Sequence, residues 1–108
     1  MYIPTDNVIA GAIGSLNDMA VEKKVPLIVG EANMVHAGGS ITIGVDYYNL
    51  GKETALMAVQ ILKDGKSPKD IPSVGLSEYS LIINKKQLDQ MEITIPQALL
   101  EKADEVLN

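Results

Sequence analysis

Short apolar runs and amphipathic stretches alternate along the first part of the chain, and this pattern predicts strands and helices in turn. Tyr2-Ile3 ends a strand at Pro4, and apolar runs follow over residues 25–30 and 40–45. Such short, continuous apolar runs are typical of parallel strands covered on both faces. Because each predicted strand leads into a helix, we expect an α/β fold with a parallel sheet, right-handed crossovers and helices on both faces.

Polar caps and glycines set the expected ends of the three helices in this part. The first follows residues 5–7, and the second covers residues 32–37 and closes at Gly38-Gly39. The third is predicted to be capped by Asn49 and to end at Gly65. The stripe expected to pack on the sheet in the first helix is Ile9, Ile13, Leu16 and Ala20, and the apolar side of the third helix is Leu50, Met57, Ile61 and Leu62.

The last third of the chain has a different pattern of polar and apolar residues. Residues 64–72 are polar and contain two prolines and a glycine, which predicts a linker. A fourth strand is expected over Tyr79–Ile83, followed by a short helix that Asn84 caps and that runs through Leu88. Pro96 is expected in the first turn of a closing helix whose apolar side is Leu99, Leu100, Ala103, Val106 and Leu107.

Composition and charge exclude several classes of function. Fourteen acidic residues face nine lysines and no arginine, a net charge of −5, so nucleic acid is not expected as a partner. No cysteine is present and His36 is the one histidine, so we expect no disulfide, no metal centre and no cofactor. No apolar run approaches the roughly 20 residues of a membrane-spanning helix, and residues 1–30 do not have the pattern of a secretory signal.

The residues just after the predicted strands are the candidates for a binding site, because ligands of parallel sheets bind at the carboxyl ends of the strands. One interpretation is that carboxylates on this edge receive a cationic group such as the ammonium of an amino acid, beside a tyrosine face. The other is that these acidic residues cap the following helices. The candidates are Thr5, Asp6 and Asn7 after the first strand, Glu31 after the second, and Asp46 and Tyr47 after the third.

Other motifs give little support to catalysis. The glycines of residues 11–14 and 38–39 match neither a dinucleotide-binding nor a P-loop pattern. Ser15 falls inside a predicted helix rather than on a nucleophile elbow, and His36 is expected to be packed or exposed at an edge. Because no nucleophile and base are paired by the pattern, we predict that the protein is not an enzyme.

Four segments carry a resemblance to a known family. They are YIPTDN at residues 2–7, VPLIVGE at 25–31, GVDYYNLG at 44–51, and IIN at 82–84 with ITIP at 93–96. In order and spacing the chain resembles the C-terminal portion of the ABC-transporter substrate-binding proteins related to tryptophan and tyrosine uptake. One departure is Met91-Glu92, which stands where members usually carry Leu-Gly.

This resemblance implies a type I periplasmic-binding-protein fold, in which two Rossmann-like lobes close on a ligand. The chain would be a single C-terminal lobe over residues 1–108, three-layered and flavodoxin-like. Residues 1–63 would form its core, 64–78 a linker, and 79–108 a returning strand with C-terminal helices. By analogy, the loops bearing Asp6, Asn7, Glu31 and Asp46 face the cleft and bind a small amino-acid-like ligand without catalysis.

The same resemblance implies a partner and a location for a full-length parent. The partner would be an ABC permease, and the parent would be a cell-surface lipoprotein or a periplasmic protein that begins with a signal. An isolated lobe would bind ligand poorly and expose apolar surface, so we expect a homodimer formed by exchange of the segment from about Ser77 onward. The alternative is a free-standing flavodoxin-like module that regulates or binds protein partners.

Overall fold

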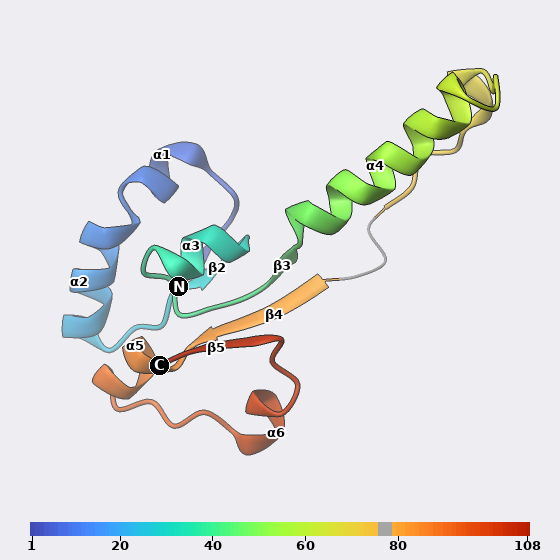
Figure 1. Ribbon diagram of the computed structural model, residues 1–108. Coiled ribbons are helices and arrows are strands. Elements are labelled where there is room, and N and C mark those ends of the chain that lie inside the picture. Colours follow the sequence, from blue (N-terminus) through green and yellow to red (C-terminus); the bar gives the residue numbers. More distant parts are fainter. Residues whose placement is uncertain (76–78) are drawn as a thin grey trace.

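A five-stranded sheet organises the computed structural model, which describes residues 1–75 and 79–108 (Figure 1). The strands lie in chain order: β1 (Tyr2–Ile3), β2 (Ile28–Val29), β3 (Ile41–Val45), β4 (Tyr79–Asn84) and β5 (Glu105–Leu107). The pairs β1·β2, β2·β3 and β4·β5 are parallel, whereas β4 runs antiparallel to β3. The predicted α/β class with a mostly parallel sheet is confirmed, and the direction reverses once, between β3 and β4.

Different helices cover the two faces of the sheet. On one face, α1 (Asn7–Gly11), α2 (Ile13–Lys23) and α3 (Ala32–His36) enclose a core that includes Ile3, Val29 and Ile82. On the other face, the segment containing α5 (Lys85–Gln90) and α6 (Gln97–Leu100) packs over β4. Next to it, the same face of β1 and β2 is open, and the side chains of Tyr2 and Ile28 there are 68% and 46% exposed.

The first predicted helix is divided in two. Its expected inward positions Ile13 and Ala20 are buried, as the spacing indicates. Ala12, with φ −107° and ψ 6°, leaves the helical conformation between α1 and α2. The neighbouring glycines, Gly11 and Gly14, have low helix propensity and make this break inexpensive.

Two buried hydroxyl groups tie β2 to β3. Ser40 Oγ accepts a hydrogen bond of 2.7 Å from the Leu27 amide, and Thr42 Oγ1 donates one of 2.7 Å to the Val29 carbonyl. Both side chains are fully buried. Because β2 is two residues long, these bonds supplement a short backbone ladder. Side-chain as well as main-chain hydrogen bonds therefore hold β2 and β3 together.

The helix α4 (Tyr47–Leu62) projects away from the sheet, and none of its residues is buried (Figure 1). The expectation that every helix of the alternating part lies on a face of the sheet is therefore wrong for α4. Its cap is Asp46 rather than Asn49, and it ends at Leu62, before Gly65 with φ +70°. The predicted linker contains a 3-10 turn, η1 (Pro68–Asp70). Among the described residues, no helix is long and apolar enough to cross a membrane.

The C-terminal segment confirms one prediction and corrects another. Asn84 caps α5, its Oδ1 accepting a hydrogen bond of 3.0 Å from the Gln87 amide. The closing helix predicted through Leu107 is wrong, because α6 ends at Leu100 and residues 105–107 form β5. Asp104 starts this strand: its amide donates to the Leu81 carbonyl at 2.9 Å, and its Oδ2 accepts from the Leu81 amide at 2.8 Å.

The expected exchange of the C-terminal segment begins at Ser77, which lies outside the described residues. The part that is described, from β4 onward, pairs with its own β3 over five register positions. A salt bridge between Lys24 and Glu92 also links the end of α2 to the segment after α5. The hydrogen bond from Lys24 lowers the pKa of Glu92.

We expect Ser40→Ala to lower the free energy of unfolding by about 1–3 kcal/mol, because the buried Leu27 amide loses its partner. Urea unfolding monitored by circular dichroism measures this. The matched control is Ser15→Ala at an exposed position of α2, where no loss is expected. Equal midpoints for Ser40→Ala and the parent chain would contradict the role of this hydroxyl.

Candidate functional site

The three acidic residues after the parallel strands are all helix caps. Asp6, Glu31 and Asp46 each accept two backbone amide hydrogen bonds in the first turn of α1, α3 and α4, respectively. The capping interpretation is therefore correct for each of them. The bonds run to Asp6 from Val8 and Ile9, both 2.9 Å, to Glu31 from Asn33 and Met34, 3.0 and 2.9 Å, and to Asp46 from Tyr48 and Asn49, 2.8 and 3.2 Å.

These carboxylates can accept further hydrogen bonds beside those from the helix amides. A carboxylate has about four lone-pair positions, so a group that accepts two amide bonds keeps capacity for a ligand. Glu31 is the least accessible of the three to a ligand, because this residue is only 7% exposed. Asp6 is exposed and Asp46 is half-buried. Asp46 is therefore the capping carboxylate best placed both to be held rigidly and to meet a ligand.

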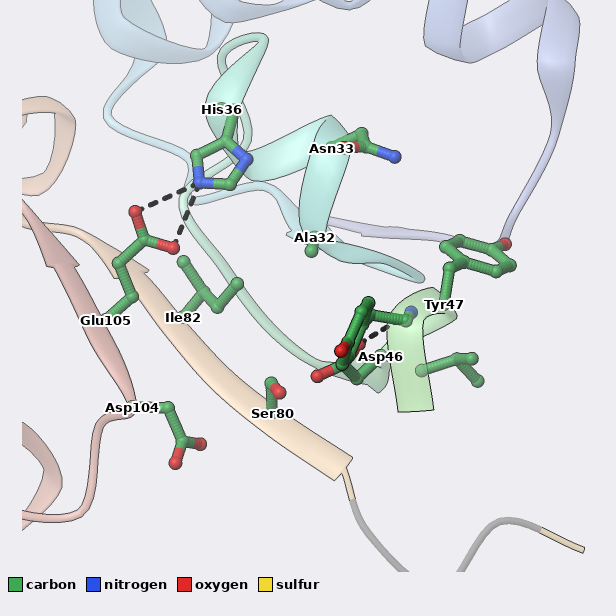
Figure 2. Close-up of a pocket in the computed structure, with 11 residues that line it drawn as sticks. Ala32, Asn33, His36, Asp46, Tyr47, Ser80, Ile82, Asp104 and Glu105 are labelled. Atoms are coloured by element: carbon green, nitrogen blue, oxygen red, sulfur yellow. Dashed lines mark hydrogen bonds and ion pairs between the residues drawn. The ribbon is translucent and has the colours of Figure 1, made fainter. Parts of the chain in front are cut away.

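A pocket of about 370 Å³ opens at the carboxyl end of β3 (Figure 2). Three parts of the chain form its walls: α3, the junction of β3 with α4, and the paired strands β4 and β5. Since β4 runs antiparallel to β3, the end of β3 meets the start of β4 here. The lining residues are Ala32, Asn33, His36, Val45, Asp46, Tyr47, Tyr48, Ser80, Ile82, Asp104 and Glu105.

Two of the six predicted site residues, Asp46 and Tyr47, line this pocket. Glu31 lies next to it in sequence, before Ala32, with its carboxylate bound to the amides of α3. Thr5, Asp6 and Asn7 are exposed at the carboxyl end of β1, on the same edge of the sheet but outside this pocket. The pocket therefore gathers the predicted residues after β3, whereas those after β1 lie outside it and Glu31 precedes its α3 wall.

The pocket also contains a pair that sequence patterns did not predict. His36 Nε2 lies 3.1 and 3.2 Å from the two carboxylate oxygens of Glu105, and the two side chains face each other in Figure 2. His36 is exposed, as expected for an edge position. Glu105 was expected in a helix, and it reaches the pocket because β5 pairs Glu105 with Ile82. That pairing leaves no local signal in the sequence.

The electrostatic character of the lining is acidic and aromatic. Carboxylates come from Asp46, Asp104 and Glu105, whereas the described lining residues include no lysine. Tyr47 and Tyr48 also line the pocket and are 51% and 77% exposed, respectively. This combination favours a cationic group, which carboxylates bind by charge-assisted hydrogen bonds and aromatic faces attract. Within residues 1–75 and 79–108, no group of three or more His, Asp or Glu residues is arranged to hold a metal ion.

Comparison with known proteins gives consistent matches over nearly the whole chain. The family model described as ABC transporter substrate binding protein matches residues 1–107. A protein named tyrosine-binding protein from Clostridioides difficile is 35% identical over 108 residues, which cover 97% of this chain and 31% of that protein.

Solved structures agree with these sequence matches. A Streptococcus pneumoniae ABC domain in complex with L-Trp superposes with a TM-score of 0.83 at 33% identity, covering 98% of this chain and 36% of that one. A ligand-free, open substrate-binding protein with adhesive properties from Clostridium difficile gives 0.78 at 32% identity, covering 99% and 35%. The chain thus spans about a third of the length of the relatives it matches.

Asp46→Ala is expected to weaken the first turn of α4 by about 1 kcal/mol, since two amides lose their cap. Hydrogen exchange at the Tyr48 and Asn49 amides should become about fivefold faster. Asp46→Asn keeps a good capping side chain and should exchange close to the parent rate. Glu53→Ala, an exposed mid-helix change, is the second control, and equal exchange in it and in Asp46→Ala would contradict the assignment.

Proposed function

The chain belongs to the family of ABC transporter substrate-binding proteins, and we propose that it supplies one side of the ligand site of such a protein. In this proposal the ligand is a small amino acid or a similar amine, and its ammonium group enters the pocket at the end of β3. The observation that carries the proposal is the acidic and aromatic lining of that pocket, in a chain related to a tyrosine-binding protein.

Asp46 would be the principal contact for the ammonium group. Its Oδ1 is engaged by two amides of α4, and its Oδ2 accepts from Asn49 Nδ2 at 3.1 Å, so the carboxylate is fixed before a ligand arrives. A rigid acceptor loses little entropy on binding. Tyr47 would lie against the apolar part of the ligand. The other predicted residues would line the same edge of the sheet beside the pocket: Thr5, Asp6, Asn7 and Glu31.

The lining lacks a basic group suited to the ligand carboxylate. His36 faces Glu105, and the neutral donors among the described lining residues are Asn33, Tyr47, Tyr48 and Ser80. Small-molecule sites bury most of their ligand, and this pocket is open on one side. We therefore propose that the chain alone binds weakly and that a second lobe, as in a two-lobed binding protein, would complete the contacts.

The remaining features follow from the family. We propose an ABC permease as the partner, an extracytoplasmic location, and binding without catalysis. The organisation proposed for residues 1–108 is one C-terminal lobe, with a core at 1–63, a linker at 64–78 and a returning segment at 79–108. A free-standing flavodoxin-like regulator is disfavoured, because the family model matches residues 1–107.

An NMR titration of the chain with L-tyrosine, L-tryptophan and glycine tests the ligand class. We expect weak, saturable shifts centred on the amides of Asp46, Tyr47 and Ser80, which line the pocket. Asp46→Asn preserves the cap but removes the charge, so affinity should fall about tenfold, equivalent to roughly 1.4 kcal/mol.

Glu53→Gln removes the same charge from an exposed position of α4 outside the pocket lining and should leave the affinity unchanged. Absence of shifts with every amino acid tested, or equal affinity of Asp46→Asn and the parent chain, would contradict the proposed site.

A further inference from the structure

His36 is the one histidine of the chain, and it lies in the wall of the pocket at the end of β3 (Figure 2). It belongs to the last turn of α3, and its Nε2 lies 3.1 and 3.2 Å from the two carboxylate oxygens of Glu105. The two residues are 69 positions apart in the sequence, so the fold creates this contact. The proposed contacts of Asp46 and Tyr47 with a ligand do not involve this pair.

The contact between His36 and Glu105 is possible in both charge states of the ring. A neutral imidazole that carries its hydrogen on Nε2 donates to a carboxylate, and the protonated ring donates as well. Imidazole is also the side chain whose charge ordinarily changes between about pH 5 and 8. A rise in pH therefore removes one positive charge from this wall without requiring the two side chains to separate.

The titratable groups around His36 are carboxylic acids and phenols. The described lining residues include no lysine, so the ring of His36 is the cation that this lining can supply. The strands β2 and β3, which pack on α3, contain no titratable residue, and β4 contains Tyr79. The other groups are Glu31 on α3, Asp46, Tyr47 and Tyr48 where α4 begins, and Asp104 and Glu105 where β5 begins.

We infer that His36 controls the charge of the pocket and makes the binding of a cation depend on pH, an inference that rests on the proposed function. When the ring is neutral, a bound ammonium group faces three carboxylates, those of Asp46, Asp104 and Glu105. When the ring is protonated, one positive charge opposes the ligand. Because the ligand cation and the ring proton repel each other, binding of either one disfavours the other. Affinity for an amine therefore rises with pH as the ring loses its proton.

The chain contains one other group of a kind that titrates in this range, the α-amino group of Met1. That group donates a hydrogen bond of 2.7 Å to the Pro26 carbonyl. Met1 precedes β1, so it lies at the amino ends of the parallel strands, whereas the pocket is at the carboxyl end of β3. Since His36 is the one histidine, a single substitution removes the imidazole charge from the whole chain.

An NMR titration of the chain with tyramine at about pH 5.5, 6.5 and 7.5 measures the effect. Tyramine has the phenol ring and the ammonium group of tyrosine but no carboxylate, so the sign of its charge is fixed. We expect the dissociation constant of the parent chain to fall about threefold from the lowest to the highest pH. His36→Gln keeps a donor for Glu105 but no charge. Its dissociation constant should equal the parent value at the highest pH and stay there at all three.

Two further variants separate the charge of His36 from other causes. Lys86→Gln removes a cation from an exposed position of α5 outside the pocket lining, and it should keep the pH dependence of the parent chain. Glu105→Gln should bind more weakly at every pH but still gain affinity as the pH rises, because His36 is retained. Circular dichroism at each pH checks that the variants fold as the parent chain does.

The possible failures of this inference and of the proposed function differ. Saturable binding with the same dissociation constant at all three pH values would overturn the role of His36 alone. A pH dependence that persists in His36→Gln, or that disappears in Lys86→Gln, would do the same. Absence of tyramine binding at every pH would overturn both, since the ammonium group would then not be the part of the ligand that this pocket holds.

Discussion

The hydrogen bonds that Ser40 and Thr42 make with the main chain around β2 are the constraint on which the candidate site depends. The strand they hold has two residues, too few for its own ladder to position the segment after it. Immediately after β2 come Glu31, which caps α3, and the helix that carries His36. Gly44 fits the same arrangement, since a Cβ there would lie 2.7 Å from Thr42 Oγ1 and 3.0 Å from Glu31 Cα. The end of β3, and with it Asp46, is thereby held against the end of β2.

Capping and binding are compatible uses of one carboxylate. A cap fixes the rotamer of Asp46 through two amides, while the charge stays directed toward the positive end of α4. A side chain held in this way is a better acceptor for a ligand than a free one, because its orientation costs nothing further at binding. The capping that the structure shows is therefore compatible with the proposed binding, in which the cap would supply the rigidity and the remaining lone pairs would accept from the ligand.

Local signals predicted the parts of this fold that are determined locally. Strand endings at Ile3 and Val45, caps at Asp6 and Asn84, and the buried positions of α2 follow from residue type and spacing. The signals failed where distant segments decide the structure. Residues 105–107 have an apolar pattern that also suits a helix, and their parallel pairing with β4, next to the Asp104–Leu81 hydrogen bonds, makes them a strand. For the same reason Glu105 could not be placed opposite His36. The apolar side predicted on α4 has the spacing of a packed helix, but the helix projects away from the sheet (Figure 1) and none of its residues is buried.

The reversal of direction between β3 and β4 has a consequence for folding and for evolution. These strands form the most extensive pairing in the sheet, yet they are joined through α4 and the following segment, so the pairing must close a long loop. Loop closure disfavours pairing by an entropy that grows only logarithmically with length, about 0.6 kcal/mol for each doubling. The sheet should consequently form late relative to α4, which is stabilised by local contacts. Insertions or deletions in the segment that joins β3 to β4 should then change the free energy of unfolding little. This segment can therefore vary in length while the pocket between β3 and β4 keeps its shape.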